Sequence, residues 1–535
     1  MTISTRERLL FILIALVGAF FITRGLIAGP GFTDVFYHLN AANRLVSGHG
    51  LTDAYLWTYI GAPETLPVPS HLYWMPLTSL SAAFGMWLFN APGNYAAAQF
   101  PLTLMFAGTV YVGFWLGGRL GGTRRHAWIA GLLTLFSGFY TRFWGAVDTF
   151  APYALVGSLC LVFMSLAVDR PENETSNRRT LLFFALAGAM SALAHLTRAD
   201  GILLLLVGWA VILWPFGKGL SPRQRILALV MMTGTYLLVM LPWFTRNLNV
   251  IGTPMPLGGT QSIWFTEYND IFNYPPQSSP ATFFANGLGT LFATRWEAFA
   301  GNQGLFSGNL GTFFAVEGLV VMTPLMLVGL WRRRRLRFLR GFWLYALGVH
   351  LAMTLIFPYP GYRGGLLHSA AALVPWWAVL GVVGLDDCVD WIAKRRRTWN
   401  AGVAKLIFSG ALLAVAIFLS VTIGQRNVVP PVKTPILYQE LIDKLPKDAR
   451  VMINDPGQLY YFTGFSGVVL PNEAPDAILD IARKYQVDYV LFEEVTPENT
   501  AASSAKLWPI LTALPDFLTP VPLNNPDVRL YAIHY

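Results

Sequence analysis

The sequence predicts a multi-pass α-helical membrane protein that ends in a small C-terminal α/β domain. Of its 535 residues, 54% are hydrophobic and only 13% are charged, whereas soluble domains carry about 25% charged residues. Apolar runs approaching the length that a membrane span needs, about 20 residues, recur through residues 1–424. Residues 425–535 instead alternate short apolar runs with polar segments, which indicates a separate folded domain.

The apolar runs predict about eleven spans by the window rule. A further apolar segment, 72–91, contains Pro76 and a polar face, which is typical of a helix that lies in the membrane interface. The N-terminal run resembles a signal peptide, but it has no small-residue cleavage site, so we interpret it as an uncleaved first span. The predicted spans are 9–28, 95–117, 126–142, 150–168, 180–196, 200–216, 226–244, 311–330, 341–357, 366–384 and 402–423.

Positive charge orients these spans. With the N-terminus in the cytoplasm and segment 72–91 not counted as a span, the inner loops hold most of the Lys and Arg residues, including the runs 332–335 and 394–397. Cytoplasmic loops carry such an excess. The sequence therefore predicts a plasma-membrane or inner-membrane protein with its C-terminal domain outside. The net charge of +9 is then a topology signal and does not indicate nucleic-acid binding.

Two outer segments and the C-terminal domain are long enough to hold ordered structure. The first outer loop, 29–94, is expected to carry interfacial helices, and the loop 245–310 is rich in Gly, Pro, Asn and aromatic residues, as ordered binding loops are. In the C-terminal domain, VMI, VVL and YVLF predict strands. Residues 475–486 predict an amphipathic helix. A domain of this size is long enough to fold alone.

Asp34 is the first candidate catalytic residue. It follows the first span in the stretch GFTDVFYHLN and begins a predicted helix over 35–47, with Phe36 and Leu39 available to face lipid. His38, four residues later, shares its face if Asp34 is helical. The alternative is an N-cap carboxylate that satisfies backbone N–H groups.

Further charged residues lie at predicted outer ends of spans. Asp148 stands at the mouth of the fourth span, where it could also be a helix cap. Arg198 and Asp200, in LTRADG, form an outer hairpin, and ionisable residues so close to hydrocarbon usually face the protein interior or a wet cavity. The alternative for these two residues is a local ion pair.

Arg246 and Arg363 are each the only cation near their outer helix ends. A guanidinium suits a lipid phosphate because it can bind it with two hydrogen bonds, although snorkelling to the interface explains each alone. No His and Asp cluster has metal-ligand spacing, so no metal ligand is predicted, while a divalent metal stays open. Cys160 and Cys388 lie in or beside apolar runs, and no disulfide is expected.

Taken in order, these motifs resemble the GT-C superfamily of membrane glycosyltransferases, which includes protein O-mannosyltransferases and lipid A aminoarabinose transferases. The matching stretches are FTDVFYHLNAANRLVSGHGL with Asp34, VPSHLYWMPL with His71, GAVDTFAPYAL with Asp148, LTRADG, PWFTRNLNVIGTPMP and RGGLLHS. Two departures are that the segment after His71 lacks paired prolines, and that Ala199 stands where the superfamily usually has Pro.

The resemblance implies an inverting glycosyltransferase that moves a sugar from a polyprenyl-phosphate carrier to an acceptor on the outer face of the membrane. It implies Asp34 as the general base and Asp148 as a group that positions the acceptor. Partners would be the lipid-linked donor, membrane lipids and an acceptor that is a protein, a lipid or a glycan. The other implied contacts, to substrate or phosphate, are His38, His71, Arg198, Arg246 and Arg363.

Two other classes of function stay open on the sequence. A transporter or flippase of lipid-linked sugars would place its binding charges near the middle of the membrane, whereas here they fall at the outer ends of the spans. A non-catalytic scaffold would use the outer domain to bind a partner. Whether Asp34 and Asp148 face one cavity distinguishes an enzyme from both.

Overall fold

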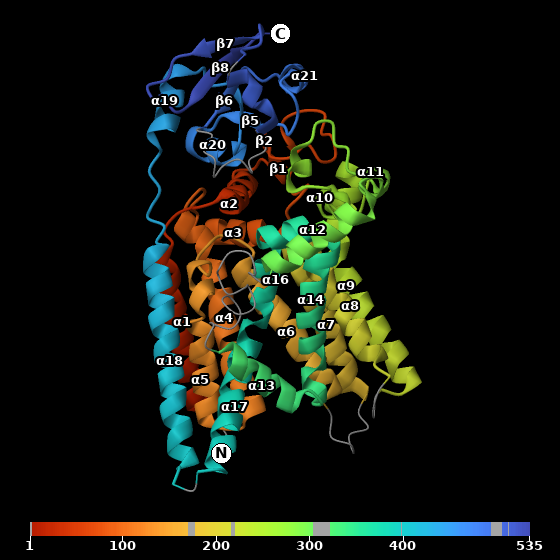
Figure 1. The fold of residues 1–535 in the computed structure, drawn as a ribbon, viewed down its shortest axis with the longest axis vertical. Coiled ribbons are helices and arrows are strands. Elements are labelled where there is room, and N and C mark those ends of the chain that lie inside the picture. Colours follow the sequence, from red (N-terminus) through yellow and green to blue (C-terminus); the bar gives the residue numbers. More distant parts are fainter. Residues whose placement is uncertain are drawn as a thin grey trace.

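A bundle of long helices carries a smaller mixed domain on one end, which is the upper end in Figure 1. The computed structural model describes residues 3–169, 177–215, 220–302, 322–396, 398–493, 505–511 and 513–534. Within these residues, 8 helical segments are long and apolar enough to cross a membrane. They are Thr5–Leu26 (α1), Tyr95–Gly121 (α4), Phe150–Val168 (α6), Arg178–Thr197 (in α7, Asn177–Thr197), Pro222–Ile251 (α9), Arg337–Ile356 (containing α14, Arg340–Leu351), Arg363–Ala393 (containing α16, Leu366–Ala370, and α17, Val374–Ala393) and Ala401–Arg426 (α18).

Eight of the eleven predicted spans thus correspond to such a segment among the described residues. The predicted spans 126–142 and 200–216 contain the helices α5 (Arg124–Leu135) and α8 (Ile202–Leu213), of 12 residues each. Twelve residues rise by about 18 Å, which is less than the hydrocarbon thickness of about 30 Å. Of the predicted span 311–330, residues 311–321 lie outside the described residues, and α13 (Thr323–Arg333) covers most of the remainder.

Two helices of the first outer loop lie across the upper end of the bundle (Figure 1). They are α2 (Thr33–Val46) and α3 (Leu77–Leu88). On α3 the polar residues Thr78 and Ser79 are buried, whereas Phe84 and Trp87 are exposed. An amphipathic helix with this orientation can rest its apolar face on the membrane, as the sequence predicts for 72–91. The loop 245–310 forms α10 (Leu257–Gln261), α11 (Pro280–Ala285) and α12 (Gly287–Asn302).

The C-terminal domain is built on a six-stranded mixed sheet in the order β2-β5-β4-β6-β8-β7. The predicted strands are β5, β4 and β6, which pair in parallel, and the predicted helix is α21 (Asp476–Tyr485). Strand β2 comes from the first outer loop, so the sheet reaches across the division at residue 424. The strands are β2 (Tyr55–Leu56), β4 (Arg450–Ile453), β5 (Ser466–Val469), β6 (Tyr489–Phe492), β7 (Leu518–Val521) and β8 (Arg529–Ile533), with helices α19 (Ile436–Lys444) and α20 (Pro456–Thr463) beside them.

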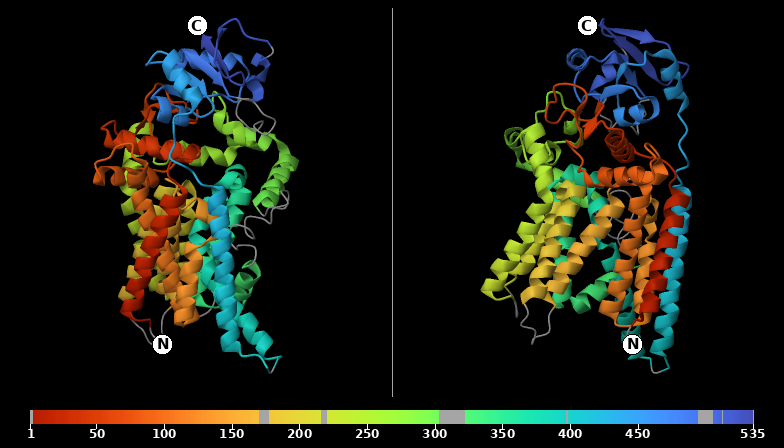
Figure 2. Two further views of the ribbon diagram at one scale, coloured as in Figure 1. Left: turned by 90° about the vertical axis from the view of Figure 1, so that its left-hand side faces the viewer. Right: turned by 180° about the vertical axis from the view of Figure 1, so that it is seen from behind.

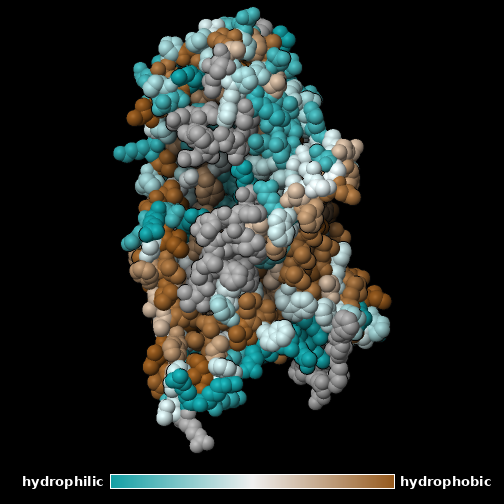
Figure 3. Space-filling view, in the orientation of Figure 1, coloured by the Kyte–Doolittle hydropathy of each residue, from teal (hydrophilic) through white to brown (hydrophobic). Residues whose placement is uncertain are grey.

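The first and last long helices, α1 and α18, lie side by side (Figures 1 and 2). Where they end, the chain pairs with itself, because the Ala28 amide donates to the Val429 carbonyl and the Val429 amide donates to that of Leu26. The surface of the bundle is largely apolar between a more polar C-terminal domain and a polar lower rim (Figure 3). This distribution is that of a multi-pass membrane protein with one domain outside the hydrocarbon.

Candidate active site

A cavity of about 270 Å³ lies at the upper end of the bundle, below the C-terminal domain. Its walls come from α2, the first outer loop, the turns before α6 and α8, helix α10 with the segment that follows it, and the segment around α16. One part of the lining is charged and another part is aromatic. The charged residues are Asp34, Asp148, Arg198, Asp200 and Arg363, and the aromatic ones are Trp57, Tyr73, Trp74, Tyr268, Phe357 and His368.

Asp34 is not a helix cap. Helix α2 begins at Thr33, its N-cap residue is Phe32, and no side chain caps it. The Asp34 side chain instead accepts a hydrogen bond from the Trp74 indole, with 3.2 Å between Nε1 and Oδ1. As a first-turn residue, Asp34 also benefits from the positive end of the helix dipole, and its carboxylate lines the cavity.

Asp148 is fully buried in the turn that precedes α6. Its Oδ1 accepts from the Thr149 backbone amide at 2.5 Å. Its Oδ2 has no hydrogen-bond partner among the described residues and lies 3.6 Å from His368 Nδ1. A buried carboxylate oxygen without a partner is costly to maintain, so this oxygen marks a place where a ligand or proton is expected.

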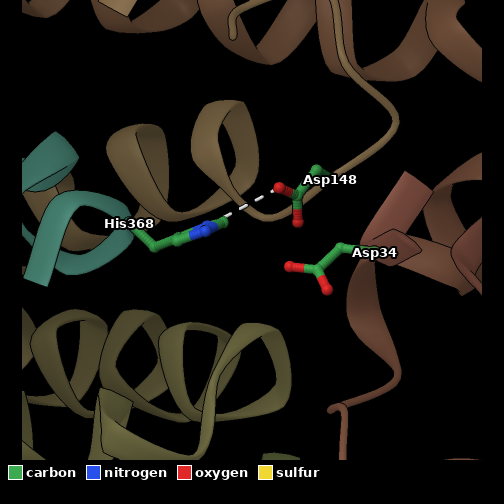
Figure 4. A group of neighbouring side chains, drawn as sticks. All are labelled: Asp34, Asp148 and His368. Carbon is green, nitrogen blue, oxygen red and sulfur yellow. Dashed lines mark ion pairs between the residues drawn. The ribbon is translucent and has the colours of Figure 1, made fainter. Parts of the chain in front are cut away.

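His368 completes the group from α16. Its Nδ1 lies 2.7 Å from the Thr149 hydroxyl, and its ring stacks on Phe150 with 3.9 Å between centroids. Figure 4 shows the imidazole and the two carboxylates converging from three separate segments. The sequence prediction missed His368, although this residue lies in the motif RGGLLHS, because the prediction for that motif named only Arg363.

Burial raises the pKa of both carboxyl groups. For Asp34 the cost of desolvating the charge is partly offset by the nearby Arg198 guanidinium. For Asp148, burial raises the pKa, and the negative charge of Asp34 raises it further. Two carboxylates this close do not ionise independently. Asp34 therefore loses its proton first, and Asp148 is the member of the pair that holds a proton more readily.

The same three residues fit a divalent cation. One ligand atom from each of Asp34, Asp148 and His368 lies within 4.8 Å of the others. Two carboxylates and an imidazole are hard-to-borderline donors that suit Mg²⁺, Mn²⁺ or Zn²⁺, and the unpartnered Asp148 Oδ2 is one of the free donor atoms. These residues are far apart in the sequence, which is why no local metal-ligand spacing could reveal them.

Two of the predicted arginines line the cavity. Arg198 is held by Asp200, with 2.9 Å between Nε and Oδ1, and by the Ser369 hydroxyl at 3.1 Å. The local ion pair that the sequence left as an alternative is thus present, and both of its members line the cavity. Arg363 is exposed, and its guanidinium carbon lies 4.4 Å from the centre of the Tyr268 ring.

The other three predicted residues do not line this cavity. Arg246 donates to the carbonyls of Leu51 and Ser70, at 3.2 and 3.0 Å, and so braces the first outer loop. The buried rings of His38 and His71 both contact the Ser79 hydroxyl, at 2.8 and 3.0 Å. Burial lowers the pKa of His38 to about 3 and that of His71 well below its usual value. Both rings are therefore neutral and belong to the packing behind the cavity wall.

No protein-family model and no curated protein sequence matches this chain. Its fold, however, matches solved structures. The apo oligosaccharyltransferase of Archaeoglobus fulgidus superposes with a TM-score of 0.64 at 13% identity, covering 97% of this chain and 73% of that one. Its complex with an inhibitory peptide and a dolichol-phosphate, described as AglB, gives 0.60 at 13%, covering 90% and 69%.

ArnT from Cupriavidus metallidurans, bound to undecaprenyl phosphate, superposes with a TM-score of 0.54 at 16% identity. The match covers 99% of this chain and 98% of that one. At such low identity the likeness concerns the fold alone, yet it runs over nearly the whole chain. The structure of this protein is therefore similar to those of GT-C membrane glycosyltransferases.

Proposed function

We propose that this protein is an inverting glycosyltransferase that moves a sugar from a polyprenyl-phosphate carrier to an acceptor on the outer face of the membrane. The observation that carries the proposal is the joint placement of Asp34 and Asp148 in one cavity with Arg198 and Arg363. The elements that line this cavity, among them α2, α10 and α16, lie at the upper end of the helical bundle (Figure 1), where a lipid phosphate at the interface and an acceptor from outside can both arrive.

The transfer requires one proton acceptor and one stabilised leaving group. An acceptor hydroxyl or amine attacks the anomeric carbon, and a new glycosidic bond forms there. The bond between that carbon and the phosphate oxygen breaks, and its electron pair leaves with the carrier phosphate. The acceptor's proton goes to Asp34, whose pKa is raised by burial toward neutrality, as suits a general base.

Asp148 has a different part in this reaction. Because burial and the charge of Asp34 raise its pKa further, it can hold a proton and donate a hydrogen bond to the acceptor or the sugar. His368 and the Thr149 amide fix its position. Two carboxyl groups with separated pKa values are a common arrangement for dividing acid and base roles.

The two guanidinium groups supply the positive charge that the leaving phosphate needs. Arg198 is rigidly held by Asp200 and Ser369, so its remaining N–H groups are oriented before the donor binds. Such preorganised donors stabilise developing negative charge efficiently. Arg363 is exposed and rests on Tyr268, which suits a residue at the lipid entrance.

A divalent cation held by Asp34, Asp148 and His368 would supply Lewis-acid stabilisation of the phosphate when bound. Both carboxyl groups would then be ionised, since a carboxylate binds a cation in its deprotonated form, and Asp148 would serve as a ligand in place of holding a proton. Arg198, which lines the same cavity, would bind the same phosphate.

The geometry favours an enzyme over the two alternatives. A flippase needs charges along a path through the bundle, whereas the elements that carry the cavity's charged residues meet at its upper end (Figure 1). A scaffold has no need of two carboxyl groups, one half-buried and one buried, within reach of one ligand, because they cost stability when empty.

The test is mass spectrometry of lipid-linked sugars and surface glycans in a deletion strain. The proposal expects accumulation of a polyprenyl-phosphate-sugar together with a glycan, lipid or protein that lacks one sugar. Restoring the wild-type chain should reverse both changes, and Asp34→Asn should reverse neither. The proposal is contradicted if the deletion strain shows neither the accumulated polyprenyl-phosphate-sugar nor the missing sugar on an acceptor. It is also contradicted if Asp34→Asn reverses these two changes.

A further inference from the structure

The C-terminal domain contacts three separate segments that line the cavity, close to the lining residues themselves. These segments carry Thr33 and Asp34 at the start of α2, Trp57 after β2, and Tyr268 in the loop 245–310. Each contact lies within a few residues of a lining side chain, so the domain holds part of the cavity wall in place.

The first contact joins Thr33 to Asp455. The Thr33 hydroxyl donates to Asp455 Oδ2 at 2.6 Å. The other oxygen of this carboxylate, Oδ1, caps α20 by accepting from the Gln458 amide at 3.0 Å. As the N-cap of α20, Asp455 thus links the start of that helix to Thr33, the first residue of α2, next to Asp34.

Further contacts press α20 against α2 along its length. The Asn40 side chain donates to the Gly457 carbonyl at 2.8 Å, and Arg44 donates to the Tyr460 hydroxyl at 3.1 Å. The ring of Phe36 lies 5.2 Å from that of Tyr461, centroid to centroid. One face of α2 is therefore fixed by the C-terminal domain.

The second contact is the strand pairing of β2 with β5. Tyr55 and Leu56 pair in parallel with Gly467 and Val468. Trp57, which lines the cavity, is the next residue after this strand. Its position therefore follows from the register of a sheet that belongs mainly to the C-terminal domain.

The third contact joins Asn472 to the loop that carries Tyr268. The Asn472 side chain donates to Glu267 Oε1 at 3.0 Å and to Asn273 Oδ1 at 2.8 Å. Its backbone amide donates to the Phe272 carbonyl at 3.0 Å. Asn472 is buried, so this junction is closed to solvent.

From these contacts we infer that Asp455 is a positioning residue of the transfer site, which orients Asp34 by holding Thr33 at the start of α2. The inference rests on the proposed function. Asp455 does not line the cavity, so it acts on the site through its hydrogen bond to Thr33 and through its negative charge, which raises the pKa of Asp34. A displacement of about 1 Å at a reacting group can cost about 10²-fold in rate, which sets the expected size of the effect.

Two substitutions separate this positioning role from the capping of α20. Asp455→Asn keeps a good N-cap, and its amide can still bond the Thr33 hydroxyl, which accepts as well as donates. Asp455→Ser also keeps the cap, but its shorter side chain does not reach Thr33. Both variants lack the charge of Asp455, so the difference between them reports the contact with Thr33. We expect kcat of Asp455→Ser to lie about 10²-fold below that of Asp455→Asn, with little difference in KM for the lipid donor.

A double-substitution cycle tests whether the effect passes through Thr33. Thr33→Val removes the hydroxyl and keeps the size, and it should lower kcat alone but add little to Asp455→Ser, since both remove one interaction. The substrate is the polyprenyl-phosphate-sugar that accumulates in the deletion strain. Asp476→Ser, at an exposed acid in the first turn of α21, is the matched control and should transfer like wild type.

Equal kcat values for Asp455→Ser and Asp455→Asn, or additive effects with Thr33→Val, would overturn the inference. If Asp455→Ser does not fold, full turnover by Thr33→Val overturns it just as directly. Failure of the proposed function looks different, because neither the wild-type chain nor the Asp476→Ser control would then transfer the sugar.

Discussion

Asp34 is oriented by aromatic side chains rather than by other charges. Its hydrogen-bond donor Trp74 stacks on Tyr37, with 4.0 Å between ring centroids. The Tyr37 hydroxyl in turn donates to Asp53 at 3.0 Å and accepts from the His71 amide at 2.6 Å. Such a packed series leaves Trp74 few other rotamers, so the indole N–H holds the carboxylate in one orientation.

Replacing the carboxylate of Asp34 should abolish most of the transfer without unfolding the protein. Asp34→Asn keeps the size of the side chain and the acceptor for Trp74, but it removes the base. Loss of a general base typically costs about 10²–10⁴-fold in turnover. Purified wild-type and variant proteins are compared for kcat and for thermal stability. Turnover by Asp34→Asn close to that of wild type would exclude Asp34 as the base.

Arg363 and Arg246 should respond differently to the same substitution. Arg363→Ala removes a cavity cation, and a charge-assisted hydrogen bond is worth about 1.5–3 kcal/mol, so Kd for undecaprenyl phosphate should rise about 10- to 100-fold. Arg246→Ala instead leaves the carbonyls of Leu51 and Ser70 without their donor and should lower Tm. An unchanged Kd for Arg363→Ala would limit Arg363 to an interfacial role.

Asp53 should make stability depend on pH. Burial raises its pKa to about 7, although Tyr37 and Arg44 partly oppose this, and its Oδ1 has no hydrogen-bond partner among the described residues. A carboxyl whose pKa is higher in the folded state than in the unfolded state, about 3.9, stabilises the fold at low pH. That contribution is lost as pH rises from about 4 through about 7.

The comparison is therefore between wild type and Asp53→Asn, whose amide imitates the protonated acid. The two proteins should have similar Tm values at acidic pH, and wild type should melt below the variant at alkaline pH. The exposed Asp527→Asn is measured in parallel as a control for general pH effects. If the difference in Tm between wild type and Asp53→Asn stays constant from acidic to alkaline pH, Asp53 is not the source of the pH dependence of stability.

At the scale of elements, helix α2 shows what local sequence predicts and what it misses. Its predicted range, 35–47, differs from Thr33–Val46 by only one or two residues, since Gly48 ends the apolar periodicity. The prediction that Phe36 and Leu39 are free to face lipid is wrong, because both are buried. Phe36 packs on α20, and no local pattern could reveal a partner more than 400 residues away.

The residues of the cavity could be predicted only in part, because some of them come together only in the fold. The position of charged residues along the sequence was enough to identify four of the lining residues, because each stands at the end of a predicted span: Asp34, Asp148, Arg198 and Arg363. His368 and the aromatic wall were missed, because aromatic residues at span ends have an interfacial explanation and only the fold brings them to the carboxylates. His71 and Arg246 show the converse, since their motifs are prominent but their side chains brace the loop.

The hairpin between α7 and α8 offers a test at this scale. Gly201 has no room for a methyl group, since a Cβ there would lie 2.4 Å from the Ala194 carbonyl group. Gly201→Ala should therefore displace Arg198 and Asp200 and weaken donor binding, measured as Kd for undecaprenyl phosphate. Gly234→Ala on α9, where a Cβ would meet nothing within 4 Å, is the control and should be neutral. Wild-type affinity in Gly201→Ala would show that the hairpin tolerates this displacement.

At the scale of the whole molecule, the helical bundle and the C-terminal domain form one unit around the cavity. The sheet of the C-terminal domain takes its edge strand β2 from the first outer loop, and the chain leaving α18 pairs with the chain leaving α1. The segments that carry Thr33, Trp57 and Tyr268 in the cavity wall are therefore tied to the C-terminal domain. The side of the membrane on which this unit lies decides which acceptors can reach the cavity.

Cysteine labelling tests that side directly. In a background with Cys160→Ser and Cys388→Ser, single cysteines replace two exposed residues, Asp527 in the C-terminal domain and Arg335 at the lower end of the bundle. Because cationic loops stay in the cytoplasm, Asp527→Cys should react with a membrane-impermeant maleimide in right-side-out vesicles, and Arg335→Cys only in inside-out vesicles. The reverse pattern would place the cavity on the cytoplasmic side of the membrane. It would exclude transfer to an outer acceptor, because in the proposed reaction the donor phosphate and the acceptor meet in this cavity.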